Sequence, residues 1–285
     1  MKALKKYRGI KSFTSTVLFV SIIISGCGNI VNTEKNKPTD KTATTQITDQ
    51  KPVIKEVPAV KTEQLIVEHG PRDKKNIALT FDADMTPSML KKLQTKKVKT
   101  LYDKRITDTL EETSTPATIF ITGLWAETYP EETKNLSKNP LFEIANHSLT
   151  HGSFTKECYG LGLVPDKNKE LSETQKILKE LTNLTPKYFR FPGGCYRKED
   201  LKIVANEGLI PVQWDVISGD AFQKDSSKIS STVINKTTNG SIIVMHLNGA
   251  PNAPGTAEAL PSIIKELKKK GYTFVKMSEL LSGNR

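Results

Sequence analysis

The chain has 285 residues, of which 36% are hydrophobic and 26% are charged, and its formal net charge is +11. This length accommodates one large domain or two small ones. Beyond Cys27 only Cys158 and Cys195 remain, which excludes a disulfide framework or a cysteine-rich metal site.

Residues 1–26 have the pattern of a bacterial secretion signal. The first 13 residues carry five basic side chains and no acid, an apolar segment follows at Val17–Ile24, and two small residues precede Cys27. The stretch "ISGC" resembles the lipobox of lipoproteins, in which the cysteine is acylated. The alternatives are an uncleaved anchor and an ordinary secretion signal. We therefore expect an exported protein that lipidated Cys27 anchors to the outer face of the cytoplasmic membrane of a Gram-positive bacterium.

Residues 27–72 predict a disordered tether, because they are rich in polar residues and Pro and have few apolar ones. Removing residues 1–26 lowers the formal net charge from +11 to +6, since five basic residues are lost and all 31 acids remain. A basic surface outside a cell suggests anionic wall polymers or lipid head groups as neighbours. We expect no nucleic acid, because no basic motif with interleaved aromatic residues is present, and we infer no protein partner.

Residues 73–285 are predicted to form the folded domain. Short β-rich runs alternate there with helical stretches, which indicates a parallel sheet covered by helices. Seven such runs in one domain favour a barrel or an open doubly wound sheet. The runs are 77–81, 117–121, 142–146, 188–192, 209–216, 241–247 and 272–276.

Three helical stretches lie between the runs. Residues 170–182 place their Leu and Ile side chains near one face, and Ile263, Ile264 and Leu267 do the same before Gly271. Residues 87–112 predict a helix that is broken. In such folds the active site forms at the carboxyl ends of the strands.

Polar groups suited to chemistry follow five of the seven runs. They are Asp82 and Asp84, His147 and His151 in "NHSLTH", Arg190 in "FRFPGG", Asp215 and Asp220 in "WDVISGD", and His246. Two acids after an apolar run otherwise indicate a turn, and Asp220 has the alternative of an ordinary loop residue.

His147 and His151 are four residues apart, which on a helical turn would put both imidazoles on one face, a common arrangement of metal ligands. Two His with one carboxylate leave room for water and substrate on a metal. The alternative is a pair of surface or capping His. For His246 the alternative is a core residue bonded to a backbone carbonyl. The apolar residues around Arg190 predict that its guanidinium is buried and therefore needs a carboxylate partner. The alternative is an Arg on an edge strand that points to solvent.

These residues, in this order, resemble the polysaccharide deacetylase family, the NodB homology domain. "TFDADM" resembles its T-F-D-D-G motif, "NHSLTH" its H-[ST]-x-x-H metal motif, and "RFPGG" its R-x-P-x-G motif. "WDVISGD" resembles D-x-x-D-W imperfectly, and "VMH" resembles L-x-H. The resemblance covers about residues 73–282. It implies an α/β fold, a distorted (β/α) barrel with about seven parallel strands.

The resemblance also implies the role of each site residue. His147 and His151 bind a divalent metal, Zn²⁺ before Co²⁺, Mn²⁺ or Ni²⁺. Asp82 is the general base and Arg190 orients it. His246 is the general acid, tuned by Asp220, and the backbone near Tyr196 helps hold the oxyanion.

The sequence departs from the family pattern at three positions. Ala83 stands where a second Asp is usual, which makes Asp84 the candidate for the third metal ligand; the alternative is a water supported by Asn146. Ile217 and Ala221 replace the usual Asp and Trp of the fourth motif, which bears on how the substrate fits.

The expected function is a carbohydrate deacetylase, a hydrolase of linear amides, that removes N-acetyl groups from amino sugars of cell-wall or extracellular polysaccharide, peptidoglycan-like or chitin-like. Its rivals are an O-deacetylase of acetylated glycans, a catalytically silent glycan-binding lipoprotein and a solute-binding lipoprotein. Cys158 and Cys195 each follow a site motif, so we expect that they pair at the barrel mouth. Two free thiols are the alternative.

Overall fold

The structure, a computed structural model, describes residues 66–282. All of these residues belong to the second of two units into which the chain divides, Met1–Ala59 and Val60–Arg285. The predicted signal peptide, Cys27 and most of the predicted tether lie outside the described residues. Among the described residues no helix has the length and apolar character needed to span a membrane.

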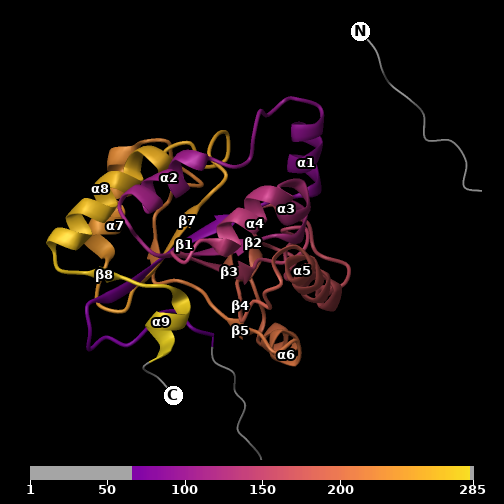
Figure 1. Cartoon of the computed structure of the whole chain (residues 1–285). Coiled ribbons are helices and arrows are strands. Elements are labelled where there is room, and N and C mark those ends of the chain that lie inside the picture. The colour runs from indigo at the N-terminus through magenta and orange to yellow at the C-terminus, as the bar shows by residue number, and fades with distance from the viewer. Residues whose placement is uncertain (1–65, 283–285) are drawn as a thin grey trace, which may run out of the picture. The chain divides into compact units, whose positions relative to one another are not determined.

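Strands and helices alternate along the described chain (Figure 1). The strands are β1 (Asn76–Ala83), β2 (Ala117–Ile121), β3 (Phe142–Asn146), β4 (Tyr188–Phe189), β5 (Ile210–Pro211), β6 (Val216–Ile217), β7 (Ile242–His246) and β8 (Thr273–Phe274). The helices are α1 (Pro87–Gln94), α2 (Lys104–Glu112), α3 (Gly123–Thr128), α4 (Pro130–Lys138), α5 (Lys167–Thr182), α6 (Lys198–Asn206), α7 (Ser226–Lys236), α8 (Thr256–Lys269) and α9 (Met277–Leu281).

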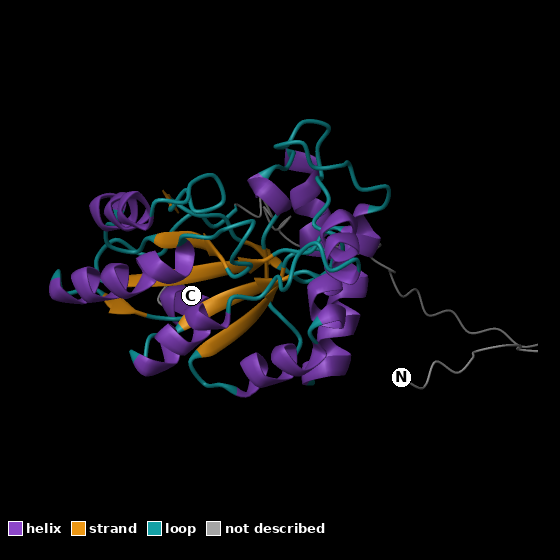
Figure 2. Ribbon diagram, turned by 90° about the horizontal axis from the view of Figure 1, so that it is seen from above, coloured by secondary structure: helices purple, strands orange, loops and turns teal. Residues whose placement is uncertain are grey.

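Seven parallel strands form a curled half-barrel in the order β5-β4-β3-β2-β1-β7-β6, and β8 adds to β1. Every pairing between these strands is parallel. Figure 2 shows the strands fanning out in the middle with helices around them. The predicted α/β fold, a distorted barrel with about seven parallel strands, is confirmed, and so are the helix at 170–182 and the break between α1 and α2.

The period of two along β1 separates two layers of the core. Ile77, Leu79, Phe81 and Ala83 belong to the large cluster that the helices cover, whereas Ala78 belongs to the cluster inside the curl. All eight β1 residues except Asn76 are buried, as expected of a central parallel strand with both faces covered. The even-numbered residues of β1 therefore face the inside of the half-barrel.

The prediction of one strand at 209–216 was wrong. This run forms two strands at opposite ends of the sheet path, because β5 pairs with β4 whereas β6 pairs with β7. Residues 212–215 cross from one edge to the other. A run of apolar residues predicts extended chain but does not specify its partner, and here the partner changes at Pro211.

The segment that begins at residue 66 fills part of the gap between these edges. Val67 forms a bridge with Val212 and His69 forms one with Ser241. Arg72 donates a hydrogen bond of 2.8 Å to Asp215, whose carboxylate also accepts from the backbone N of Ile242. Residues 66–72 thus already bond to the fold, while the boundary at residue 73 stays a prediction.

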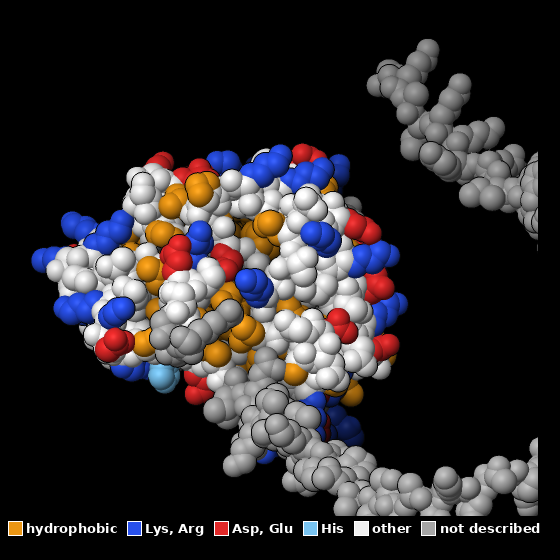
Figure 3. Space-filling view, turned by 60° about the horizontal axis from the view of Figure 1, so that its bottom comes forward, with side chains coloured by type: hydrophobic (Ala, Val, Ile, Leu, Met, Phe, Trp, Pro, Cys, Tyr) orange, Lys and Arg blue, Asp and Glu red, His pale blue; other side chains and the backbone are white. Residues whose placement is uncertain are grey.

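Charges of both signs lie on the face turned forward in Figure 3, where basic and acidic side chains are interspersed around the edge. The net positive charge is not gathered into one field on that face. This distribution fits a solvated surface better than a single electrostatic binding patch.

Candidate active site

Asp82 and Asp84 face the same side because the extended chain continues through them. β1 runs to Ala83, so residues 82 and 84 point into the half-barrel while Ala83 packs with the helix layer, 0% exposed. In a strand, alternate side chains point to opposite faces. The spacing D-A-D therefore delivers two carboxylates to one site without any redirection by a loop.

Two neighbouring side chains fix the backbone just beyond β1. Asn248 accepts a hydrogen bond from the backbone N of Asp84 and donates one of 2.7 Å to its carbonyl oxygen. The hydroxyl of Thr122 donates to the carbonyl of Ala83 at 3.1 Å. The position of the Asp84 carboxylate is thus set by buried bonds on both sides of the chain.

His147 and His151 lie in a tight loop after β3. They do not lie on a helical turn, because Ser148 and His151 have left-handed φ angles of 69° and 54°. The loop nevertheless brings the imidazoles together, with ring centroids 5.0 Å apart. The two imidazoles therefore meet through a loop rather than on one face of a helix.

A buried carboxylate from α5 holds this loop in place. Glu170 is 5% exposed, and its Oε2 accepts hydrogen bonds from the backbone N of Leu149 and of Thr150 at 2.9 and 2.8 Å. Its Oε1 accepts from the Thr150 hydroxyl at 2.8 Å. Sequence reasoning missed Glu170, although its helical spacing from buried Thr174 and Leu178 puts an acid on a core-facing side, where an acid needs partners.

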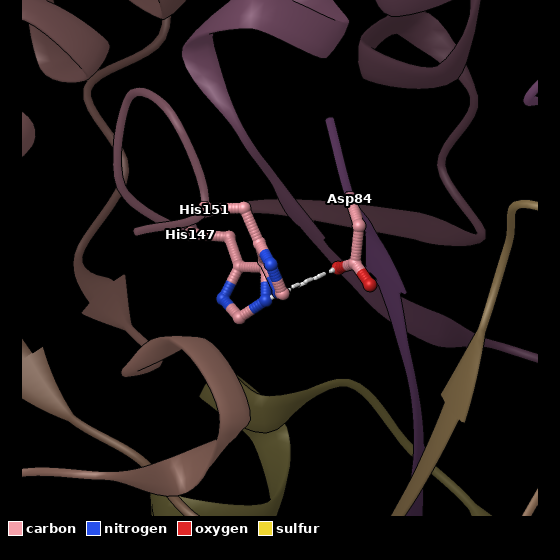
Figure 4. Close-up of side chains that lie close together, drawn as sticks. All are labelled: Asp84, His147 and His151. Carbon is pink, nitrogen blue, oxygen red and sulfur yellow. Dashed lines mark ion pairs between the residues drawn. The ribbon is translucent and has the colours of Figure 1, made fainter. Parts of the chain in front are cut away.

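Asp84, His147 and His151 form a cluster whose ligand atoms all lie within 4.8 Å of one another. Asp84 Oδ1 is 3.3 Å from His147 Nε2 and 3.2 Å from His151 Nε2. Figure 4 shows both imidazoles pointing towards the carboxylate of Asp84, which follows β1 directly in the chain. Two His and one Asp are a usual ligand set for a catalytic divalent metal.

The hydrogen bonds around the cluster fit a cation. His147 Nδ1 lies 2.9 Å from the carbonyl oxygen of Arg190, which can only accept, so Nδ1 carries a proton and Nε2 is the ring nitrogen that faces the cluster as a possible ligand. His147 Nε2 and Asp84 Oδ1 are both buried without a hydrogen-bond partner. Two such atoms facing each other are costly unless a cation lies between them. The cluster is thus suited to a divalent metal.

Burial and the neighbouring imidazoles together set the pKa of Asp84. Burial acts to raise the pKa of this carboxyl, but His151, His147 and His246 outweigh it and hold the pKa well below the usual range. Asp84 is therefore ionised at neutral pH, as a metal ligand must be.

Arg190 is fully buried, and the carboxylate partner that its burial required is Asp82. Nη1 of Arg190 donates to Asp82 Oδ1 at 2.6 Å. The guanidinium lies over the ring of Phe120, 3.9 Å from its centroid, and its Nη2 donates to the carbonyl of Gln213 at 3.3 Å. These contacts leave Asp82 Oδ2 free on the side of His147 Nε2, 3.6 Å away.

The side chain of Asn146 does not point to the metal cluster, although its Oδ1 accepts from the backbone N of Ser148 at 2.9 Å. Asn146 is the last residue of β3 and faces the helix layer, where its side-chain amide donates to Leu171 O and Gln175 on α5. Because neighbouring residues of a strand point to opposite faces, Asn146 and His147 cannot both face the site. The predicted alternative to Asp84 therefore finds no support.

His246 stands at the carboxyl end of β7, in register with Asp82 on β1. Its Nδ1 is 2.7 Å from Asp220 Oδ1, and its backbone N donates to Asp220 Oδ2 at 2.7 Å. Burial lowers the pKa of His246, but the Asp220 carboxylate outweighs it and raises the pKa to about 10. His246 is thus an imidazolium at neutral pH, with Nε2 3.9 Å from Asp84 Oδ2.

Asp215, the two cysteines and Tyr196 were also singled out from the sequence. Asp215 does not belong to the site, because it bonds Ser241 and Ile242 at the amino end of β7, the end opposite His246. Cys158 and Cys195 are disulfide-bonded, with Cα atoms 5.9 Å apart, so the expected pairing is confirmed. Tyr196 follows this bridge, and its ring stacks on Phe191 with centroids 5.1 Å apart.

Gln213 is a second residue that sequence reasoning missed. Besides holding Arg190 through its carbonyl, it donates from Nε2 to Gly194 O at 2.7 Å and from its backbone N to Val67 O at 2.7 Å. No local signal marks it, since its partners come from two distant parts of the chain, residues 190–194 and Val67.

Comparison with known proteins places this architecture in a family. The family described as Polysaccharide deacetylase matches residues 69–212, just over half of the chain. The chain belongs to the polysaccharide deacetylase family. Each of the metal-cluster residues lies inside the matched range, whereas Asp220 and His246 lie beyond it.

Particular relatives share most of the described fold. A peptidoglycan-N-acetylglucosamine deacetylase of Bacillus cereus is 28% identical over 220 residues, which are 76% of this chain and 72% of the relative. The crystal structure of a peptidoglycan N-acetylglucosamine deacetylase superposes with a TM-score of 0.65 at 26% identity, covering 76% of this chain and 92% of that one. Over the first four curated relatives, the matched segment spans 54 to 90% of the relative's length.

A third similarity shows why the fold does not decide the activity. A pseudoenzyme of the same family from Bacillus anthracis has a TM-score of 0.62 at 24% identity, covering 76% of this chain and 69% of that one. Catalytic competence therefore has to be argued from the residues of the site.

Proposed function

We propose that the protein is a metal-dependent deacetylase that removes N-acetyl groups from the amino sugars of cell-wall or extracellular polysaccharide. One observation carries the proposal: an ion-paired carboxylate and a carboxylate-bound imidazolium, Asp82 and His246, stand in register on neighbouring strands beside a cluster suited to a metal. Simple binding of a glycan requires neither of these two groups.

The proposed cofactor is Zn²⁺, held by Asp84, His147 and His151, with Co²⁺, Mn²⁺ or Ni²⁺ as substitutes. Imidazole and carboxylate ligands in this number suit zinc and leave a position for substrate. When bound, the cation supplies Lewis acidity that polarises the amide carbonyl and acidifies a water molecule.

Asp82 is proposed as the general base. Its Oδ1 is committed to Arg190 at 2.6 Å, so Oδ2 is the oxygen that receives the proton of the attacking water. Arg190 holds the carboxylate in one orientation, because Arg190 is itself fixed by Gln213 O and by the ring of Phe120. Asp82 is kept for proton transfer while Asp84 serves as the ligand.

His246 is proposed as the general acid. Asp220 keeps its Nδ1 bonded and raises its pKa to about 10, so Nε2–H is available towards the site at neutral pH. Nε2–H protonates the amine as it leaves the carbonyl carbon, since an amine is a poor leaving group without a proton. The backbone near Tyr196 is proposed to donate to the developing oxyanion.

Acetate release tests this proposal. The purified protein is incubated with peptidoglycan, N-acetylglucosamine oligomers and acetylated xylan, with a chelator and after Zn²⁺ is restored. We expect acetate from one of the amino-sugar polymers, loss with the chelator and recovery with Zn²⁺. Acetate from xylan alone would identify an O-deacetylase instead.

A catalytically silent glycan-binding protein is the second candidate, favoured by the displaced carboxylate of "DADM" and by the existence of a pseudoenzyme with this fold. The fully metal-loaded protein would then bind glycan but release no acetate from any of the three polymers. This outcome would refute the proposed activity without affecting the proposed metal site.

We also propose that the mature protein is exported and attached through a lipid on Cys27 to the outer face of the cytoplasmic membrane of a Gram-positive bacterium. The sequence pattern supports this, and the residues concerned lie outside the described part of the chain. Incorporation of a labelled fatty acid into the wild-type protein but not into Cys27→Ser tests it. Equal labelling of both would refute it.

A further inference from the structure

Two aromatic rings stand in solvent beside the site without a described role. Tyr159 is 76% exposed and Phe222 is 75% exposed, and their ring centroids are 5.7 Å apart. They come from loops that are far apart in sequence yet meet in space. Contiguous exposed apolar side chains, unlike scattered single ones, mark an interaction surface.

Both rings are presented by tight turns. The backbone N of Leu161 donates to Cys158 O at 2.8 Å, and that of Phe222 donates to Gly219 O at 3.0 Å. Tyr159 and Gly160, the central residues of the first turn, have φ angles of 49° and 76°. A bulky residue is rarely found there, because the left-handed region suits Gly, Asn and Asp. The fold thus holds a strained backbone to expose a tyrosine.

Tyr159 is held by a disulfide next to the segment that carries Tyr196. Its neighbour Cys158 is bonded to Cys195, next to Tyr196. A Cβ added at Gly193 would lie 3.2 Å from Tyr159 Cδ2 and 2.7 Å from Cys158 Sγ. The tyrosine ring therefore packs over the turn that follows Arg190.

Phe222 lies in the loop that positions the proposed acid, His246. It lies two residues after Asp220, whose carboxylate bonds His246. The two rings accordingly belong to the two loops that would flank a sugar whose amine is at His246. A depression of about 560 Å³, lined by Lys156, Glu157 and Gly160 among others, adjoins Tyr159.

We propose that Tyr159 and Phe222 form a stacking platform for a neighbouring sugar ring of the same polysaccharide chain, a subsite outside the reacting position. This inference rests on the proposed function. The chemistry favours a sugar because the faces of a pyranose ring carry C–H groups, which pack against the electron-rich face of an aromatic ring. Lys156 and Glu157 supply hydrogen-bonding groups for the hydroxyls at its edge.

The disulfide has a positioning role in this proposal. It ties the turn of Tyr159 to residues 192–196, so the ring is held in place before the polymer arrives. Preorganisation of this kind reduces the conformational entropy lost on binding.

The test compares substrates of increasing length. Tyr159→Ala, Phe222→Ala and the double variant are assayed on N-acetylglucosamine oligomers of two to six units and on peptidoglycan. We expect the double variant to raise KM for the long substrates about 3- to 10-fold, with kcat and the shortest active substrate unchanged. Tyr159→Phe retains the ring and should match wild type. Leu184→Ala removes another exposed apolar side chain, 46% exposed, and is the matched control.

Binding is measured separately from acetate release, by calorimetry with the hexamer and by sedimentation with peptidoglycan. If wild type binds, the double variant does not, and neither releases acetate, the activity is refuted while the platform stands. Unchanged KM and binding in the double variant would overturn the platform. So would an equal loss on long and short substrates, which indicates a structural role, or no binding by wild type to either ligand.

Two further measurements sharpen the result. In a Cys158→Ser, Cys195→Ser background, Tyr159→Ala should have a smaller effect on KM than it has in wild type, because the ring is no longer held. An effect of undiminished size would remove the disulfide from the proposal. Loss of binding to phosphatidylglycerol vesicles in the double variant, with glycan binding intact, would show that the rings meet lipid and would overturn the platform.

Discussion

The β6–β7 side of the site satisfies its own charges, whereas the β1–β3 side does not. Asp220 accepts hydrogen bonds from the Ser218 and Thr256 hydroxyls and from the backbone and Nδ1 of His246. Asp84 Oδ1 faces two imidazole nitrogens, and no donor among the described residues bonds it. One side is complete as folded, and the other is built to receive a cation. Substitutions on the two sides should therefore fail in different ways.

The largest effect is expected from removing the imidazoles of the open side. The double variant His147→Ala, His151→Ala should contain no metal and should have background activity, because Asp84 alone is a weak ligand for a divalent cation. Elemental analysis and acetate release measure the two losses. Full metal occupancy in this variant would refute the assignment of the site.

The two carboxylates at the end of β1, Asp82 and Asp84, provide the matched comparison. Asp84→Ala should weaken metal binding, with activity partly recovered in excess metal, whereas Asp82→Ala should keep its metal and lose activity. Identical metal affinity in Asp84→Ala and wild type would reduce Asp84 to a turn residue.

On the complete side, loss of the acid should leave the metal in place. His246→Ala is expected to lower kcat by about 10²- to 10⁴-fold, the usual contribution of a general acid, with metal content unchanged. The melting temperature at neutral pH should fall as well, because the buried Asp220 carboxylate loses its charged partner. A large loss of stability with normal kcat would instead make His246 a core residue.

Glu170 connects the open side to the helix layer without touching the metal. Glu170→Ala leaves the backbone N–H groups of Leu149 and Thr150 without their acceptor, so metal affinity should fall about 10- to 100-fold. Glu170→Gln keeps an acceptor oxygen and should lose much less. Competition with a chromogenic chelator measures both. Equal affinities in Glu170→Ala and wild type would show that the loop needs no such support.

The smallest effect concerns pH and the complete side alone. Asp220 raises the pKa of His246 to about 10, so the acid is present at neutral pH and is lost as pH rises through that value. The Asp84 carboxylate also raises the pKa of His246, so a cation bound to Asp84 would lower that pKa in part. Asp220→Asn should shift the alkaline limb of kcat down by about one pH unit or more. An unmoved limb would separate Asp220 from the titration.

The same pKa bears on stability with a definite sign. A His whose pKa is raised on folding stabilises the protein fully below its unfolded pKa, about 6.5, and loses that contribution as pH rises through about 10. Thermal unfolding of wild type between these values should therefore show a decline that Asp220→Asn lacks.

Local pattern was sufficient for the centre of the sheet. β2 and β3 match the predicted runs residue for residue, because apolar runs of this length are dictated by burial on both faces. The polar residues expected at the ends of these strands also come together, since His147 lies beside the carboxylates of Asp82 and Asp84. A period of two also indicates that Asp82 and Asp84 share a face.

The edges were not predictable, since their partners are distant in sequence. β4, β5 and β6 have two residues each, and residues 212–215 change from one edge to the other between the last two. Asp215 follows an apolar run as Asp82 does, but Arg72 and the start of β7 engage it away from the site. Nothing in the residues around Gln213 or Asn248 indicates which distant backbone each will bond.

The segment that enters at residue 66 has a practical consequence for trimming the chain. Val67 O accepts from Gln213 N at 2.7 Å, Gln213 O accepts from Arg190, and Arg190 bonds the Asp82 carboxylate. A protein shortened to begin at residue 73 would look intact by its strand content, yet it would lack the first link of this chain of contacts. Val67 is thus three hydrogen bonds from the proposed catalytic base, Asp82. A recombinant fragment should therefore begin before Val67 if its activity is to be measured.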